Sequence, residues 1–346
     1  MAAENDNLED SVTRLHKMCF ALMCLMAGTA TAQAEDFYKG KTLTLLVGFS
    51  PGGGFDINAR LLARHLGRHI KGQPDVVVTN MPGASSYTSI QFLETRAPKD
   101  GTYLDTFNFA LVADSKMFPE RVKVDLRNYG WVGSISVDVT ACYVWRGFGV
   151  KSLDEVRKKP IVHMGDVGQG TSAYVNQNIL KRIFGVNVQK VLGYPGSAEQ
   201  RLAIERGELD GDCGAWASIP VEWIDGDKIL PLLKSQPSVV PGMPDNIPYM
   251  ADIAPDEHAR NLIKLLTASS GVGRPFIASK DVPAERLQIL RQAFDETMKD
   301  PAFLADAAKL RMPVTPKNAA ESRQVLDEIY GASADLVKEA REIAGD

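Results

Sequence analysis

The sequence predicts an α/β fold made of two lobes of similar design. Its 346 residues exceed the size at which a single hydrophobic core usually stops growing, so two domains are expected. Strand-like and helix-like segments alternate along the chain, which is typical of layered α/β proteins with largely parallel sheets. A strand, a glycine-rich turn and a helix follow one another once in the first third and once in the middle.

The first of these units starts with alternating apolar residues that predict a strand over Lys41–Phe49. A glycine-rich turn separates this strand from a helix, in which apolar residues recur at helical spacing over 57–70. The same criteria predict three further elements: a strand at Val76–Val78, a helix over Ser85–Thr95 and a strand over Tyr103–Phe109.

The second unit is preceded by two strand-like runs around Tyr129–Trp145. The elements predicted after them are a helix opened by the capping box Ser152–Glu155, a strand at Ile161–Met164, a helix over Ser172–Phe184, a helix opened by the capping box Ser197–Gln200, a helix from Pro283 to Lys299, and two more helices at the C-terminus.

The N-terminal residues resemble a secretory signal peptide. Arg14 and Lys17 precede an apolar stretch from Met18 to Ala27, and small residues follow up to Ala32–Ala34. A basic flank, a short apolar segment and an A-x-A site together predict cleavage after residue 34 and export to the periplasm.

Composition disfavours several functional classes. The formal net charge is −4 and no stretch concentrates Lys and Arg, so a nucleic-acid partner is not expected. No uninterrupted apolar run reaches the roughly 20 residues that span a bilayer. We expect no cofactor and no metal, because the sequence has no C-x-x-C motif and no Cys/His cluster with zinc spacing.

The loop between the first strand and its helix is a candidate anion site. Successive glycines let a ligand approach the backbone, and the helix start presents unpaired N–H groups. A flexible connector is the alternative, although it does not require three glycines. The candidate ligand-binding residues here are Phe49, Ser50, Pro51, Gly52, Gly53, Gly54 and Asp56.

The same loop matches the nucleophile elbow G-x-S-x-G of α/β hydrolases at Gly48–Gly52. In that elbow, the residue after the serine donates its backbone N–H to the oxyanion hole. Here that residue is Pro51, which has no N–H. The nucleophile-elbow interpretation therefore fails. A secreted α/β hydrolase is kept only as a remote alternative, and we expect no enzymatic activity.

A second glycine-rich loop follows the strand at 161–164. Its pattern imitates the dinucleotide fingerprint G-x-G-x-x-A, but no acidic residue stands about 20 positions later to hold a ribose. We favour a second carboxylate site over mere helix capping. The candidates are Gly168, Gln169, Gly170, Thr171 and Ser172, with Asn108, Tyr194 and Trp216 as further wall residues.

Two residue pairs suggest chemistry that we do not favour. Cys142 and Cys213 lie in apolar, strand-like contexts, and two buried free thiols are preferred over a disulfide. His65 and His69 have the spacing of a metal clip, but flanking arginines and the lack of a nearby carboxylate favour a solvated helix face.

Several motifs, in this order and spacing, resemble the substrate-binding proteins of tripartite tricarboxylate transporters, the Bug or TctC-like family. The resemblance extends from Phe37 to the C-terminus. It rests on Phe37–Lys41, Phe49–Asp56, Gly72–Pro74, Asn80–Ala84, Pro98–Thr102, Gly168–Ser172, Tyr194–Gly196 and Gly207–Asp210.

The resemblance implies a type II periplasmic-binding-protein-like fold, in which two crossover strands join the lobes and the lobes close on a ligand. The crossovers would fall near Ser134–Thr140 and Thr267–Gly273. Residues 35–136 and 270–346 would then form the first lobe, and residues 137–269 the second.

The function implied is that of a monomeric periplasmic receptor. It would pass a di- or tricarboxylate, or an aromatic acid, to the permease subunits of a tripartite transporter. A ligand sensor that presents its closed form to a sensor kinase is the alternative. Gly214 stands where family members often have an acidic residue, so an amino-acid ligand is less expected than a bulkier, more apolar acid.

Overall fold

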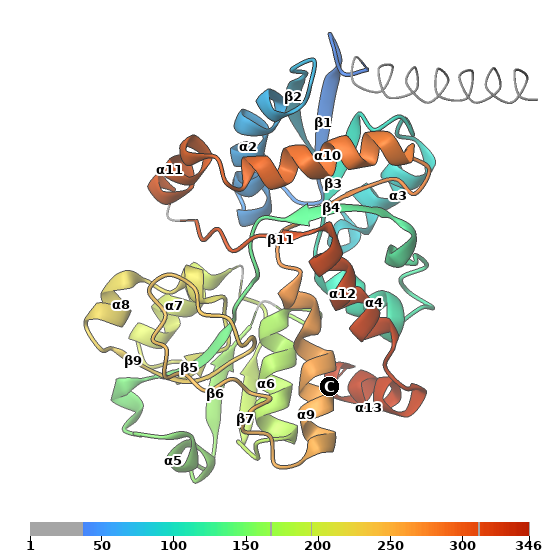
Figure 1. Ribbon diagram of the computed structural model, residues 1–346. Helices are drawn as coiled ribbons and strands as arrows, with labels where there is room; N and C mark the ends of the chain where they lie inside the picture. Colours follow the sequence, from blue (N-terminus) through green and yellow to red (C-terminus); the bar gives the residue numbers. More distant parts are fainter. Residues whose placement is uncertain (1–36, 167, 195, 311, 346) are drawn as a thin grey trace, which may run out of the picture.

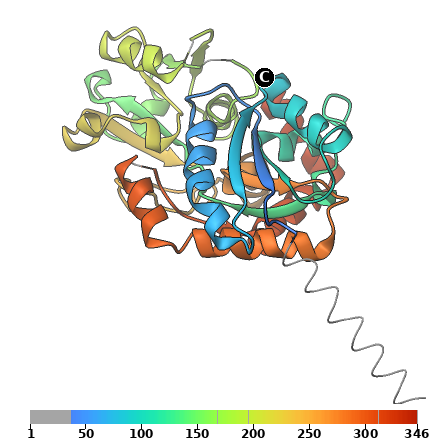
Figure 2. The same ribbon diagram turned by 90° about the horizontal axis from the view of Figure 1, so that it is seen from above.

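The computed structural model describes residues 37–166, 168–194, 196–310 and 312–345. The expected signal peptide, residues 1–34, lies outside this range. Figures 1 and 2 show two groups of strands and helices, each built around its own sheet. The expected α/β two-lobed fold is therefore confirmed. Within the described residues, no helix is both long enough and apolar enough to cross a membrane.

The first lobe contains a mixed six-stranded sheet with the order β11-β4-β10-β3-β1-β2. The predicted parallel part is present, because β1 pairs in parallel with both β2 and β3. The strands contributed by later segments, β10 and β11, run antiparallel to their neighbours. The strands are β1 (Thr42–Val47), β2 (Asp75–Asn80), β3 (Tyr103–Thr106), β4 (Gly130–Ser134), β10 (Pro275–Ala278) and β11 (Lys317–Asn318).

Helices from both ends of the sequence cover this sheet. Leu61, Leu62 and Leu66 of α2 are fully buried, as their spacing predicts, and α2 packs on β1, β2 and α10. Figure 1 shows the orange α10 crossing the direction of the blue strands, and it packs against α2 and β4. The helices are α2 (Gly54–Leu66), α3 (Tyr87–Thr95), α4 (Ala110–Met117), α10 (Ala284–Thr297), α11 (Pro301–Lys309) and α12 (Ala319–Tyr330).

The second lobe contains a five-stranded sheet with the order β7-β6-β8-β5-β9. Its strands are β5 (Ala141–Trp145), β6 (Val162–Gly165), β7 (Val188–Val191), β8 (Gly211–Asp212) and β9 (Ile229–Lys234). Its helices are α5 (Leu153–Arg157), α6 (Ser172–Arg182), α7 (Ser197–Glu205), α8 (Val221–Asp225) and α9 (Glu257–Thr267). The last helix, α13 (Ala334–Gly345), packs against α6 and α9 and also against α4 of the first lobe.

The chain passes between the sheets at neighbouring places. It leaves β4 and enters β5 through residues 135–140, and it returns through the 3₁₀ helix η6 (Ala268–Gly271) to β10. Backbone hydrogen bonds join the two crossings: the N–H of Asp138 donates to the carbonyl of Ser270, and the N–H of Arg274 donates to that of Ser136. The Arg274 guanidinium also lies 3.1 Å from the Asp138 carboxylate.

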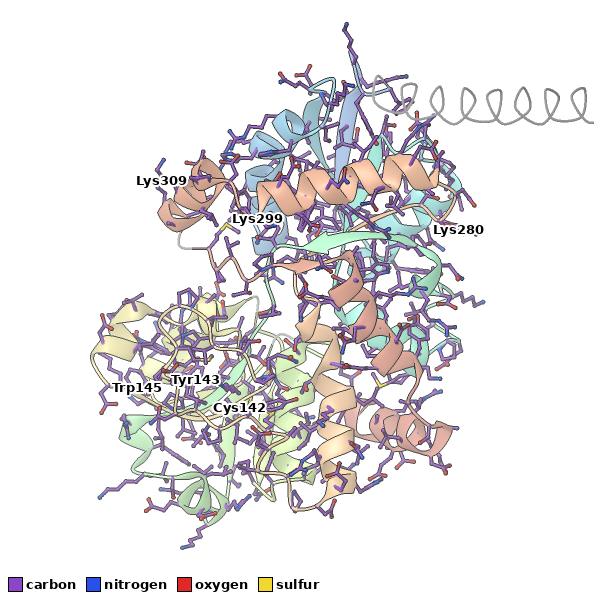
Figure 3. The ribbon with its side chains drawn as sticks, viewed as in Figure 1. Cys142, Tyr143, Trp145, Lys280, Lys299 and Lys309 are labelled. Carbon is purple, nitrogen blue, oxygen red and sulfur yellow. A yellow bond between two sulfur atoms is a disulfide. The ribbon has the colours of Figure 1, made fainter. Side chains whose placement is uncertain are left out.

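The preference for two free thiols is wrong, because Cys142 and Cys213 form a disulfide. Cys142 lies in β5, labelled in Figure 3, and Cys213 follows directly after β8. These strands run antiparallel with Tyr143 opposite Asp212, so the two cysteines face each other across the ladder. Both are fully buried. The two cysteines are 71 residues apart in the sequence, and only the pairing of their strands brings them together.

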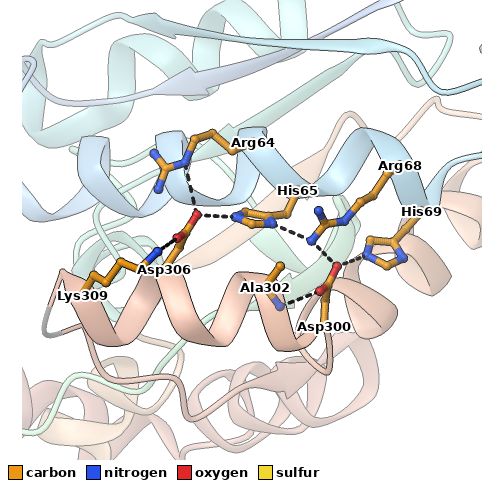
Figure 4. A network of polar contacts seen from close by, with 8 residues as sticks. All are labelled: Arg64, His65, Arg68, His69, Asp300, Ala302, Asp306 and Lys309. Carbon is orange, nitrogen blue, oxygen red and sulfur yellow. Dashed lines mark hydrogen bonds and ion pairs between the residues drawn. The ribbon is translucent and has the colours of Figure 1, made fainter.

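The expectation of a solvated histidine face is also wrong. The His65 side chain is 6% exposed, and its Nε2 lies 3.1 Å from the Asp306 carboxylate. The Nε2 of His69 lies 2.9 Å from the carboxylate of Asp300, which Arg68 also contacts. Figure 4 shows these groups between α2 and α11. The carboxylates come from a segment more than 200 residues later, so local sequence could not reveal them.

Several element boundaries differ from prediction. The N-cap of α7 is Gly196, so Ser197 is the first helical residue and not the cap. The helix expected from Ser85 begins at Tyr87, because Ser85 and Ser86 have left-handed backbone conformations. Three helices follow α10 where two were expected, and α4 and α9 were not predicted.

Candidate functional site

A pocket of about 420 Å³ lies between the two lobes. This volume falls within the roughly 300–1,000 Å³ typical of small-molecule sites. The first lobe contributes the turn at 84–87 and one side of α4. The second lobe contributes the start of α6, and the crossings contribute Thr140 and Ser270. Because both lobes and both crossings line it, a molecule held there would contact every part that a hinge motion displaces.

The second glycine-rich loop lies in this pocket, with Gln169, Gly170, Thr171 and Ser172 among the lining residues. The Thr171 hydroxyl accepts a hydrogen bond from the N–H of Tyr174 at 3.0 Å, so Thr171 caps α6. The first N–H groups of an α-helix have no carbonyl one turn earlier to bond. The N–H groups at the start of α6 are therefore oriented to receive an anion.

Asp166 holds this loop from beneath. Its carboxylate accepts hydrogen bonds from the Thr171 hydroxyl at 2.8 Å and from the Gly168 N–H at 3.0 Å. Asp166 is 1% exposed, so its charge lies below the pocket surface and does not line it. Gly168 thus contributes to the shape of the loop, whereas the following four residues form its surface.

The first glycine-rich loop is not among the segments that line the pocket. Ser50, Pro51, Gly52, Gly53 and Gly54 are exposed. The Gly54 end of the loop lies beside the guanidinium of Arg274, at the second crossing. The loop therefore borders the hinge and leaves the pocket surface to other residues.

Asp56 fixes the shape of this first loop. Its carboxylate accepts hydrogen bonds from the Gly52 N–H at 2.8 Å, from Arg60 Nε at 2.9 Å and from Asn80 Nδ2 at 2.8 Å. The hydrogen bond from Arg60 is the main cause that lowers the pKa of Asp56 to about 2. Phe49 stacks on Phe55 at 4.5 Å between ring centroids. Both residues are placed to support the loop.

A strained turn links the two parts of the first lobe that face the pocket. Ala84, Ser85 and Ser86 all have positive φ, at 44°, 52° and 78°. Such conformations are costly for residues other than glycine and persist only when their surroundings fix them. The buried Ser86 hydroxyl donates to the Gly48 carbonyl and accepts from the Asn108 N–H, both at 3.1 Å.

The remaining candidates, Asn108, Tyr194 and Trp216, are not among the residues that line this pocket. The Asn108 side chain accepts a hydrogen bond from the Ala110 N–H at 3.1 Å, at the start of α4. Trp216 is 2% exposed and packs in a core cluster with Tyr143 and Trp223. Tyr194 is half-buried, and its N–H donates to the carbonyl of Asp166 at 3.3 Å.

Sequence reasoning missed the helix α4, which supplies much of the pocket wall. Its apolar residues are buried on several sides, so they show little helical periodicity. The apolar wall is formed by Phe109, Met117, Phe118, Val122, Val175 and Leu266. Asp114 and Arg121 also line it, and they are the only charged side chains among the described lining residues.

The pocket contains no constellation suited to metal binding. Within the ranges that the structure describes, no three His, Cys, Asp or Glu side chains gather closely enough to hold a metal ion. The polar groups offered to a ligand are hydroxyls, the amides of Gln169 and Asn176, backbone N–H groups and the two charged side chains.

Comparison with known sequences finds distant relatives, although no family model matches the chain. A UPF0065 protein of Bordetella pertussis is 26% identical over 195 residues, which span 55% of this chain and 59% of that protein. A UPF0065 protein of Agrobacterium vitis is 22% identical over 320 residues, which span 91% of this chain and 87% of that protein.

Comparison with solved structures shows the fold. A TctC solute-binding protein from Polaromonas matches with a TM-score of 0.68 at 15% identity, covering 89% of this chain and 99% of that one. The periplasmic binding protein BugD matches with a TM-score of 0.58 at 19% identity, covering 89% and 99%. An R. palustris protein solved with adipate matches with a TM-score of 0.61 at 19% identity, covering 88% and 97%.

These findings agree with the motifs read from the sequence. The sequence similarity is to UPF0065 proteins, and the two lobes are arranged as in TctC and Bug receptors. The resemblance is thereby confirmed: the chain is similar in sequence to UPF0065 proteins, and it has the fold of the TctC and BugD solute-binding proteins.

Proposed function

We propose that this protein is a periplasmic receptor that binds a small organic carboxylate between its lobes and performs no chemistry on it. The cargo class comprises di- and tricarboxylates and aromatic acids. A monomeric receptor would deliver this cargo to the permease subunits of a tripartite tricarboxylate transporter. The adipate in a structural relative supports a carboxylate as the kind of ligand.

The observation that carries this proposal is the start of α6 inside an otherwise largely apolar pocket. Gly170, Thr171 and Ser172 line the pocket where the helix begins, so main-chain N–H groups and hydroxyls face the space. Such groups bind a carboxylate without a full positive charge. The apolar wall would bury the carbon skeleton, and this burial adds affinity in proportion to its area.

The crossings supply a means of closure. Their backbone hydrogen bonds join Asp138 to Ser270 and Ser136 to Arg274, which gives two adjacent segments about which the lobes can rotate. A ligand that contacts the turn at 84–87 as well as α6 gains contacts in the closed state that the open state lacks. Differential contact of this kind shifts the population towards closure.

Calorimetric titration of the purified protein with a panel of organic acids tests the proposal. We expect submicromolar to micromolar dissociation constants for at least one acid, accompanied by a higher melting temperature. An uncharged amide of the same acid serves as the control and should bind much more weakly. If no acid in a broad panel binds or stabilises the protein, the proposed function is wrong.

A further inference from the structure

The pocket contains a carboxyl group that has no partner in the protein. Asp114 lies on α4 and lines the pocket, yet its carboxylate makes no hydrogen bond or ion pair with any residue that the structure describes. Buried or half-buried carboxylates normally have such partners, because removing a charge from water is costly. Because Asp114 is half-buried and lines the pocket, its carboxylate is available to accept a hydrogen bond from a ligand in that space.

The surroundings of Asp114 favour a hydrogen-bond donor as its partner. Met117 at the end of α4, Phe118 directly after it and Val175 of α6 line the same space. Burial raises the pKa of Asp114 to about 6, although the charge of Arg121 opposes the rise. Near neutral pH the group is still mostly ionised, so it repels a second carboxylate and favours a hydrogen-bond donor.

Arg121 does not neutralise Asp114. It is exposed, and its guanidinium lies over the ring of Phe118 at 3.9 Å from the centroid. No ion pair joins it to Asp114 within the 4.0 Å limit that defines one. The pocket thus offers neutral anion-binding groups where α6 begins and an anionic acceptor on α4.

We propose that Asp114 determines ligand specificity: the bound acid carries a protonated amine or a hydroxyl that donates to Asp114, while its carboxylate faces the start of α6. This inference rests on the proposed receptor function for small organic carboxylates. Within that broad class it favours amino or hydroxy acids with an apolar body over simple dicarboxylates. The absence of an acidic residue at Gly214 had argued against such ligands, but α4 supplies the acceptor from another part of the fold.

A matched panel of six-carbon acids tests this: hexanoate, 6-hydroxyhexanoate, 6-aminohexanoate and adipate, with the five- to eight-carbon homologues of each. At pH 8, where Asp114 is ionised, we expect a donor-bearing acid to bind about tenfold or more tightly than the unsubstituted acid of equal length. The dicarboxylate should bind more weakly than either. The hydroxyl and amine series show which donor the site prefers.

The variant Asp114→Asn should remove the preference for the amine and strengthen binding of the dicarboxylate, because the repulsion is gone. Asp245→Asn makes the same charge change at an exposed position outside the pocket and should leave the order unchanged. If Asp114→Asn does not fold, the order of affinities that the wild-type protein shows for the acids of the panel still tests the role of Asp114.

The outcomes separate the two proposals. If no acid binds the wild-type protein, the proposed function itself is wrong. If hexanoate or adipate binds as tightly as every donor-bearing acid, the receptor function stands and the role of Asp114 is refuted. Tight adipate binding that Arg121→Ala abolishes would refute it too, because Arg121 would then be the group that selects the ligand.

Discussion

The two lobes share a strand–glycine turn–helix unit, but they use it differently. In the first lobe, Asp56 binds its own loop and neighbouring side chains, and the loop lies beside the hinge. In the second lobe, Asp166 holds the loop from below, so the start of α6 remains available in the pocket. The same local signature thus forms an exposed loop held by Asp56 in the first lobe, and it forms part of the pocket surface in the second.

The two lobes also differ in the contacts that hold distant segments together within each of them. In the second lobe, the disulfide between Cys142 and Cys213 cross-links two neighbouring strands of the sheet. The first lobe instead joins its helix α2 to its helix α11 through the polar contacts of His65 and Arg68 with Asp306 and Asp300. We therefore expect covalent cross-linking to matter most in the second lobe and pH to matter most in the first.

The largest effect is expected from removing the disulfide. The double variant Cys142→Ala/Cys213→Ala should lose about 4 kcal/mol of unfolding free energy, since the bridge closes a loop of 71 residues. Chemical denaturation measures this loss. A matched treatment of the wild-type protein with reductant under denaturing conditions should give a similar value. A loss below about 1 kcal/mol would show that the bridge contributes little to the second lobe.

A charge placed at either helix start should distinguish the two loops. Ser172→Asp puts a negative charge in the pocket, and repulsion of about 2–3 kcal/mol should weaken carboxylate binding roughly 30- to 150-fold. Ser50→Asp makes the same change in the exposed first loop and should weaken binding less than about threefold. Calorimetry measures both, and melting curves check folding. Equal losses in the two variants would mean that both loops contact the ligand.

A smaller effect is expected at Asp56. Asp56→Ala removes three hydrogen bonds to a charged group and should cost about 2 kcal/mol of stability with little change in affinity. The pKa of Asp56 is about 2 in the folded protein, below its usual 3.8. Its contribution is therefore complete above about pH 4 and is lost as the pH falls through 2.

Denaturation of wild type and Asp56→Ala at pH 5, 3 and 2 measures this dependence. The difference between the two proteins should shrink as the pH falls. A constant difference over that range would show that ionisation of Asp56 is not what stabilises the first loop.

Much of the fold could be predicted because the spacing of apolar residues along a helix or strand reflects which of its side chains are buried. The apolar spacing in α2 and the alternation in β1 arise from facing one core, and both elements were predicted. α4 was missed because it is buried on several sides and lacks a polar face. Asp114 was missed with it, since a single acidic residue in an unassigned segment carries no local signal.

The sequence by itself determined the two-lobed α/β plan, the glycine-bracketed helix starts and the cap formed by Thr171. These features depend on backbone conformation and on side chains a few residues apart. Only the tertiary structure decided which helix start lines the pocket, which cysteines pair and where an unpartnered carboxyl group lies. Those outcomes depend on contacts between segments tens to hundreds of residues apart, which local patterns do not encode.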